Sequence, residues 1–269
     1  MKLMEIHALN PKSIKANKKL GQHFLLDERV AELEASFGKG KGVIEIGPGL
    51  GMLTSKLCKY AKSVLAIEMD KRLCDALASS LQCDNLSIIN SDFFEVEKSE
   101  LSGYEIIISN VPYMLSSKII EWLTENELEA VLCLQKEFVE RMLATVGDRK
   151  YSRLSVMTTL ILEVEQVAEV KAEQFYPKPK VDSAIVHIKP KGTEISQREK
   201  ELIKLLMEHK KKTLRNAIID SSKALGISKD QAKKLFESLG TRNERIFRTA
   251  PKDLLGIASA ISQKLELLK

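Results

Sequence analysis

The residues of this sequence that best indicate chemistry are Asn110-Val111-Pro112-Tyr113, which follow an apolar run. An exocyclic amino nitrogen is a poor nucleophile, because its lone pair is delocalised into the aromatic ring. Two acceptors that hold its hydrogens can draw it towards a tetrahedral shape. The Asn110 side-chain oxygen and the Val111 carbonyl, turned outward by Pro112, could be these acceptors. Tyr113 offers a face for a flipped base, so the tetrapeptide predicts methyl transfer to an adenine amino group, in DNA or RNA.

A glycine-rich turn lies between the first β run and the helical pattern after it. Its glycines, Gly47, Gly49 and Gly51, let backbone amides approach a ligand closely. The next β run stops at Glu68, where a carboxylate could accept hydrogen bonds from both hydroxyls of a ribose. Asp92, after the third run, could hold an adenine amino group. The turn alone equally suits a dinucleotide enzyme, and a purely structural tight turn is a less favoured alternative.

Nicotinamide and methyl-donor sites share the ribose carboxylate, and the tetrapeptide distinguishes between them. A dehydrogenase would need a catalytic His, Tyr or Lys in a recognisable setting, whereas the fourth β run here delivers Asn110. We therefore predict S-adenosylmethionine as the methyl donor, with Asn110 beside both the donor and the amine. Because the donor carries a good leaving group, catalysis needs alignment rather than a metal ion or a strong general base, and no metal is expected. For Asn-x-Pro taken alone, a turn without function is the alternative.

Five apolar runs alternate with helical patterns over the first half of the chain. They cover residues 43–46, 63–67, 86–89, 105–109 and 130–134. Strands that alternate with helices form a parallel sheet, and uninterrupted apolar runs are typical of strands buried on both faces. The sequence therefore predicts an α/β fold: a Rossmann-like sheet with helices on both faces.

Two later β runs, at 160–164 and 184–188, are expected to complete the sheet, one of them antiparallel. A proline-rich connection at 175–181 lies between them. After Pro190 the apolar spacing is helical throughout. We therefore predict two domains, residues 1–190 for the methyl donor and a small all-α domain at 191–269.

The composition is that of an ordinary globular protein, with 44% hydrophobic and 29% charged residues. The four cysteines form no Cys-x-x-Cys pair, which argues against a zinc site or a disulfide framework. The N-terminus lacks the apolar core of a signal peptide, and no stretch is apolar enough to span a bilayer. We expect a cytoplasmic monomer without membrane contact.

Positive charge is concentrated in the predicted helical domain. Residues 191–269 contain 18 Lys and Arg against 10 Asp and Glu, a net +8, so the remainder carries −3 of the total +5. A second basic cluster, before the first β run, consists of Lys12, Lys15, Lys18 and Lys19. Two basic regions beside a nearly neutral domain favour contact with a phosphate backbone, although solvated helix faces would give the same pattern.

Several separated segments resemble one family, the ribosomal RNA adenine dimethylases, which modify two neighbouring adenosines near the end of small-subunit rRNA. The resemblance covers nearly the whole chain. Besides the tetrapeptide, its segments are Leu20-Gly21-Gln22-His23-Phe24-Leu25, Glu45-Ile46-Gly47-Pro48-Gly49, Phe175-Tyr176-Pro177-Lys178-Pro179-Lys180-Val181-Asp182-Ser183 and Lys210-Lys211-Lys212-Thr213-Leu214-Arg215-Asn216-Ala217. His23 departs from the asparagine usual in bacterial members and indicates an archaeal or eukaryotic-type member.

The resemblance implies a role for each site residue. The residues at the methyl donor would be His23, the Leu25 backbone, Glu68 at the ribose, Asp92 at the adenine and Asn110 at the reacting amine. Phe175 would lie against the target base opposite Tyr113; a core aromatic is the alternative interpretation. The helical domain, from about Lys210, would contact the ribosomal particle. The implied partners are small-subunit rRNA and the small ribosomal subunit.

Three functions are consistent with these residues. The leading hypothesis is an enzyme that transfers four methyl groups, two to each of two adjacent adenosines in a hairpin loop near the 3′ end of small-subunit rRNA, with a role in subunit biogenesis. A large-subunit rRNA adenine methylase of the antibiotic-resistance type shares the catalytic segments but acts on naked RNA. A non-enzymatic assembly factor that retained the fold is the third. The first is favoured because the resemblance extends through the basic helical domain.

Overall fold

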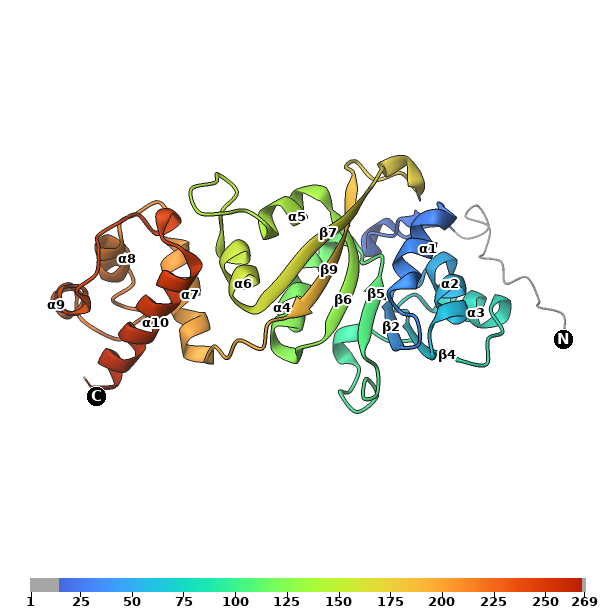
Figure 1. Cartoon of the computed structure of the whole chain (residues 1–269), viewed down its shortest axis with the longest axis horizontal. Coiled ribbons are helices and arrows are strands. Elements are labelled where there is room, and N and C mark those ends of the chain that lie inside the picture. Colours follow the sequence, from blue (N-terminus) through green and yellow to red (C-terminus); the bar gives the residue numbers. More distant parts are fainter. Residues whose placement is uncertain (1–14, 268–269) are drawn as a thin grey trace. The chain divides into compact units, whose positions relative to one another are not determined.

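The computed structural model describes residues 15–267 and divides into two compact units (Figure 1). The first unit extends to Val139 and resumes over Val164–Pro190, and the second comprises Glu140–Glu163 and the chain from Lys191 onward. Pro190 is thus the last residue of the first unit. The segment 140–163, which the sequence places with the first domain, groups with the second unit.

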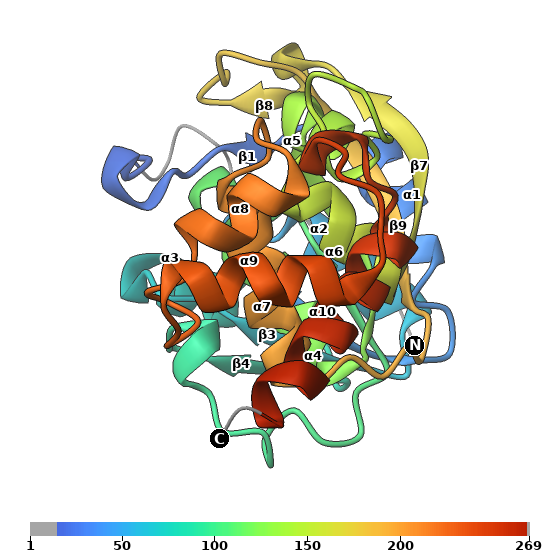
Figure 2. The same cartoon turned by 90° about the vertical axis from the view of Figure 1, so that its left-hand side faces the viewer.

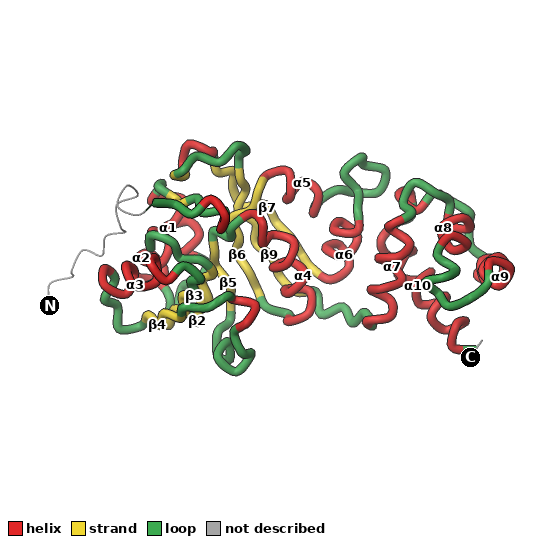
Figure 3. The backbone as a smooth tube through the Cα atoms, turned by 180° about the vertical axis from the view of Figure 1, so that it is seen from behind, coloured by secondary structure: helices red, strands yellow, loops and turns green. Residues whose placement is uncertain are grey.

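The first unit is built on a seven-stranded sheet in the order β4-β3-β2-β5-β6-β9-β7, drawn in yellow in Figure 3. Its strands are β2 (Gly42–Ile46), β3 (Ser63–Ile67), β4 (Leu86–Ile89), β5 (Ile106–Ser109), β6 (Glu129–Gln135), β7 (Leu162–Val170) and β9 (Ser183–Pro190). The strands from β4 to β6 are mutually parallel, whereas β9 is antiparallel to β6. This confirms the predicted α/β sheet with an antiparallel strand.

The helices of this unit are short. They are η1 (Lys18–Leu20), α1 (Glu28–Ser36), α2 (Met52–Tyr60), α3 (Lys71–Ser80), η2 (Phe93–Glu95), η3 (Tyr113–Leu115), α4 (Ser116–Asn126), α5 (Lys136–Met142, which continues into the second unit) and η4 (Ala172–Gln174). Asp27 and Asp70 begin α1 and α3, where each side chain accepts a backbone N–H that the helix leaves unpaired. α1 and α2 pack on each other, and their apolar faces join the core formed by the sheet.

Two predictions about strands are wrong in detail. Leu160 and Ile161 are the last residues of α6 (Arg153–Ile161), and β7 begins only at Leu162. A short apolar run does not by itself distinguish a helix end from a strand, and α6 is apolar because it packs on helices of the second unit. The start of the proline-rich connection is also a strand: β8 (Phe175–Tyr176) pairs antiparallel with β1 (Phe24–Leu25).

The second unit is helical, as the spacing after Pro190 predicts (Figure 2). Besides α6 it contains α7 (Gln197–Glu208), α8 (Leu214–Asp220), α9 (Lys229–Leu239), η5 (Ile246–Arg248) and α10 (Pro251–Glu266). Ser196 and Ser228 form capping boxes at the starts of α7 and α9, and Gly240 ends α9 in the left-handed conformation. α6 packs on α7 and α10, which explains why segment 140–163 groups with this unit. No helix in the described part of the chain is long and apolar enough to cross a membrane.

The strand order determines where a ligand can bind. From β2 the chain adds β3 and β4 on one side, then returns to add β5 and β6 on the other. The loops after β2 and β5 therefore diverge, and the crevice between them is the usual ligand site of such sheets. Because Ile44 is paired with Ile107, Gly47 and Asn110 leave the sheet side by side, each three residues farther on.

Candidate active site

A pocket opens at this crevice, beyond the carboxyl ends of β2 and β5. Ten of the predicted site residues line it: His23, Gly47, Gly49, Glu68, Asp92, Asn110, Val111, Pro112, Tyr113 and Phe175. Leu25 lines a smaller cavity that shares several of these residues, and Gly51 lines neither of the two. The fold therefore brings ten of the predicted residues, from segments between His23 and Phe175, to one pocket.

The glycines of the turn have different environments. All three have positive φ: 66° at Gly47, 59° at Gly49 and 82° at Gly51. A Cβ on Gly51 would lie 2.6 Å from Cδ1 of Leu77 in α3. A Cβ on Gly47 would lie 3.7 Å from Cδ of Pro112, at the pocket wall. Gly47 thus gives the turn its shape at the pocket, whereas Gly51 lets α2 begin close to α3.

Glu68 is held at the pocket by backbone amides. Its side chain is 5% exposed, and its carboxylate accepts hydrogen bonds from Gly49 N–H at 3.2 Å and Asp70 N–H at 2.9 Å. Burial raises the pKa of Glu68, and these backbone bonds oppose that rise. Each carboxylate oxygen can accept a second hydrogen bond. The group is therefore oriented by the protein and still able to accept a pair of ribose hydroxyls.

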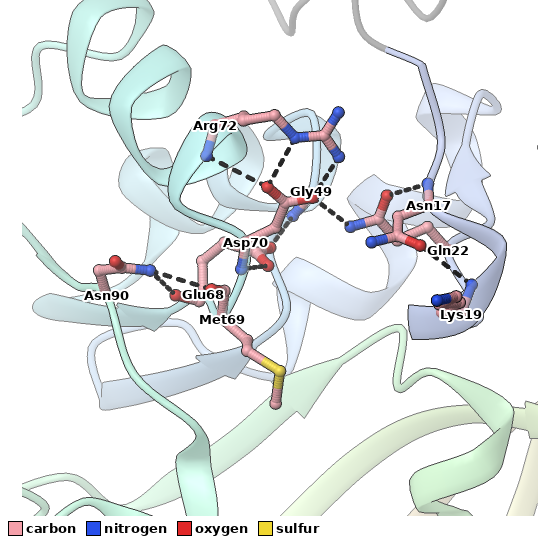
Figure 4. A network of polar contacts seen from close by, with 9 residues as sticks. All are labelled: Asn17, Lys19, Gln22, Gly49, Glu68, Met69, Asp70, Arg72 and Asn90. Atoms are coloured by element: carbon pink, nitrogen blue, oxygen red, sulfur yellow. Dashed lines mark hydrogen bonds and ion pairs between the residues drawn. The ribbon is translucent and has the colours of Figure 1, made fainter.

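Figure 4 shows how the segment before β1 is attached to the end of β3. Asp70 Oδ2 accepts hydrogen bonds from Gln22 Nε2 at 3.1 Å and from Arg72 Nη2 at 2.6 Å. These bonds, that from Arg72 foremost, lower the pKa of Asp70. Gln22 Oε1 in turn accepts from Asn17 N–H at 2.7 Å. This network was not predicted from the sequence, although Gln22 lies inside a recognised motif.

The loop after β4 provides a polar and an aromatic side chain. Asp92 begins η2 and accepts from Phe94 N–H at 3.0 Å. Phe93 is 3% exposed, lines the pocket and packs edge-on against Trp122, with ring centroids 5.0 Å apart. Phe93 was not among the predicted site residues; its position directly after Asp92 was the available signal. The two side chains suit a planar ring that carries an amino group.

Asn110 has a fixed side-chain orientation. Its Nδ2 group donates to Glu34 Oε2 at 3.0 Å, while its Oδ1 is buried and without a hydrogen-bond partner among the described residues. An unsatisfied buried acceptor costs about 1–3 kcal/mol, so a ligand that donates a hydrogen bond here removes that cost. An amino group is such a donor.

The Tyr113 ring is held from two sides. Its hydroxyl is 2.7 Å from Ser183 Oγ, and burial raises the pKa of Tyr113 to about 12. His23 stacks on the ring with centroids 5.7 Å apart, and its Nδ1 lies 2.6 Å from the Pro177 carbonyl, to which a protonated Nδ1 donates. Because His23 covers one face of Tyr113, a base has only the other face available. Phe175 is 4% exposed and lines the same pocket. Its contact with the target base stays a prediction.

The remaining predictions concern metals and charge. The part of the chain that the structure describes contains no group of three His, Cys, Asp or Glu side chains suited to a metal ion, and its four cysteines are free. In the N-terminal basic cluster, Lys12 lies outside the described residues. Lys15 and Lys18 line a groove together with Lys71 and Arg72.

Comparisons with known proteins identify relatives of this chain. The family model "Ribosomal RNA adenine dimethylase" matches residues 13–241. A "Probable ribosomal RNA small subunit methyltransferase A" of Pyrococcus abyssi is 39% identical over 251 residues, which cover 91% of this chain and 92% of the relative. The protein of the same name from Methanopyrus kandleri is 35% identical over 264 residues, 94% of both chains. Both are archaeal, in agreement with the interpretation of His23.

Solved structures show the same relationship. A dimethyladenosine transferase from Plasmodium falciparum superposes with a TM-score of 0.76 and 28% identity, over 90% of this chain and 98% of that one. The 23S rRNA methyltransferase ErmE, at 24% identity and a TM-score of 0.61 over 89% of this chain and all of that one, shares the fold. From the match of the family model and the extent of these similarities, the chain belongs to the ribosomal RNA adenine dimethylase family.

Proposed function

We propose that this protein is an S-adenosylmethionine-dependent rRNA dimethyltransferase, which methylates the amino groups of two adjacent adenosines near the 3′ end of small-subunit rRNA. The observation that carries the proposal is the unpartnered Oδ1 of Asn110 in the wall of a pocket built around Gly47 and Glu68. The names of the relatives support the small subunit as the target, and that of the Plasmodium falciparum structure supports dimethylation.

The chain's residues fit the methyl donor. Glu68 has acceptor capacity for a ribose, and Asp92 and Phe93 offer a carboxylate and an aromatic ring to an adenine. The donor would supply an electrophilic methyl on a sulfonium, which leaves as a neutral thioether. The residues of the pocket bind and orient, and positioning accounts for most of the rate enhancement expected of such a site.

At the target base, Asn110 Oδ1 would accept one N–H of the amine and the Val111 carbonyl the other. Pro112, the next residue, favours an extended backbone at Val111. The two acceptors would direct the nitrogen lone pair at the methyl group, and the proton displaced by methylation would leave to water. A monomethylated amine still has one N–H for Asn110, so the same geometry serves a second transfer.

The test is incubation of the protein with labelled S-adenosylmethionine and either small subunits that lack the modification or naked large-subunit RNA. Digestion to nucleosides should give labelled dimethyladenosine from the small subunits only. Label in the large-subunit RNA instead would favour the antibiotic-resistance type of methylase. Binding to small subunits with no label in either RNA would favour a non-enzymatic assembly factor.

A further inference from the structure

Glu34 is a buried carboxyl group directly behind Asn110. It lies on α1 with no solvent exposure, among Ala31 and Ala35, which are also fully buried. Its Oε2 accepts the hydrogen bond from Asn110 Nδ2, and its Oε1 has no partner among the described residues. Burial of a carboxyl group costs free energy on folding, and an apolar side chain at this position of α1 would avoid that cost. The hydrogen bond from Asn110 therefore indicates a functional reason for a carboxyl group at this position.

The surroundings of Glu34 disfavour its charge. Glu45 is 2% exposed, and burial raises the pKa of both carboxyl groups to about 8. The Cys133 thiol is also near and fully enclosed, and burial and the Glu34 carboxyl both raise its pKa. A carboxyl group retains an acceptor oxygen whether or not it is protonated. The hydrogen bond from Asn110 Nδ2 to Glu34 is therefore available in both states.

We propose that Glu34 is a positioning residue for the methyl-transfer reaction: by accepting from Asn110 Nδ2, it fixes the amide so that Oδ1 is presented to the substrate amine. The two ends of an amide are nearly equal in shape, so packing alone does not select one orientation. In the opposite orientation Nδ2 would meet the amine, donor against donor, and the lone pair would not be directed. This role rests on the proposed function.

The test compares kcat, KM and methyl-donor affinity for two variants of the full-length protein acting on unmethylated small subunits. Glu34→Leu removes the acceptor and should lower kcat about 10- to 100-fold, because the amine is then misoriented. KM and the dissociation constant of the methyl donor should stay within about threefold. Glu34→Gln offers a carbonyl oxygen at the same place and should restore kcat to within about fivefold of wild type.

A matched control is Glu32→Leu, on the same helix at a half-exposed position that faces Lys56 and Tyr60. It should leave kcat unchanged. The proposal is overturned if folded Glu34→Leu keeps wild-type kcat, or if folded Glu34→Gln is as impaired as Glu34→Leu. Failure of the wild-type protein to methylate would count against the proposed function instead.

A spectroscopic measurement covers the case in which the variants do not fold. The Asn110 side-chain NH₂ signals of wild type, assigned by their absence in Asn110→Ala, should exchange slowly with water, because Nδ2 donates to the fully buried Glu34. Any primary amide gives two NH₂ signals, so slow exchange with water is the result that indicates a held Nδ2 group. Rapid exchange with water would overturn the proposal without any variant at Glu34.

Discussion

Glu68 uses one acceptor position on each carboxylate oxygen for a backbone amide, at Gly49 and Asp70. In Glu68→Gln, the side-chain NH₂ group would face one of these N–H donors, so one backbone bond is lost together with an acceptor for the ribose. We expect the methyl donor to bind about 10- to 100-fold more weakly, a loss of about 1.4–2.8 kcal/mol. Calorimetric titration with S-adenosylmethionine measures this. Glu95→Gln, at an exposed position of η2, is the control, and equal affinities for all three proteins would contradict this role.

The buried carboxyl groups predict a dependence of stability on pH. The pKa of Glu34 and of Glu45 is about 8 in the folded protein, against 4.5 ordinarily, because both are buried. Between these values the folded state binds more protons than the unfolded chain. The stability linked to these protons is fully present below about pH 4.5 and is lost as the pH rises through about 8.

A glutamine at position 34 or 45 cannot ionise, so Glu34→Gln and Glu45→Gln should not lose this stability as the pH rises. The free energy of unfolding of each variant, measured relative to wild type, should therefore increase when the pH is raised from 5 to 9. The gain is on the order of 4 kcal/mol for each site. Denaturant unfolding at both pH values measures it, with half-exposed Glu32→Gln as the control. A difference from wild type that is the same at both pH values would show that these groups are not buried as described.

At the scale of elements, the turn between β2 and α2 depends on Gly51 for packing. Gly51→Ala would place a Cβ 2.6 Å from Leu77 Cδ1 at a φ of 82°. Gly103→Ala is the matched control, because its φ is 87° but no atom lies within 4 Å of its Cβ. We expect a loss of about 1 kcal/mol for Gly103→Ala and about 2–4 kcal/mol for Gly51→Ala.

Thermal and denaturant unfolding measure these losses. Folded Gly51→Ala should still bind the methyl donor, since Gly51 does not line the pocket. If Gly51→Ala lost donor affinity but no stability, the glycine would act at the ligand rather than between α2 and α3.

The elements also show what the sequence could and could not predict. Glu68, Asp92 and Asn110 each come just after an apolar run, and strand ends on one edge of a parallel sheet meet, so their convergence was predictable. Glu34 was not: on α1 it resembles any polar helix residue, and its contact with Asn110 crosses 76 positions. The two-residue strands β1 and β8 are too short for any periodicity to reveal.

At the scale of the whole molecule, the second unit has a net positive charge, with 22 Lys and Arg against 13 Asp and Glu. A groove within it is lined by Arg242, Arg248 and Lys252, with Glu244 and Asp253 beside them. If this groove contacts an RNA backbone, Arg248→Ala with Lys252→Ala should weaken binding to small subunits several-fold and should reduce the salt dependence of log Kd by about 1–2.

Filter binding at several salt concentrations measures this effect. Methyl-donor affinity should not change, because the donor's predicted contacts lie in the first unit. Lys264→Ala, at the other end of α10, is the control. An unchanged salt dependence in the double variant would mean that these side chains are solvated rather than bound to phosphate.

Asn110 is central to the proposed function, in which it directs an adenine amine of small-subunit rRNA at the methyl donor. The most direct test is to incubate wild type and Asn110→Ala with labelled S-adenosylmethionine and unmethylated small subunits, and to quantify dimethyladenosine after nuclease digestion. We predict labelled dimethyladenosine from wild type and a loss of at least about 100-fold with Asn110→Ala, which should unfold at a temperature close to that of wild type. Near-normal turnover by Asn110→Ala, or no dimethyladenosine from wild type, would contradict the account.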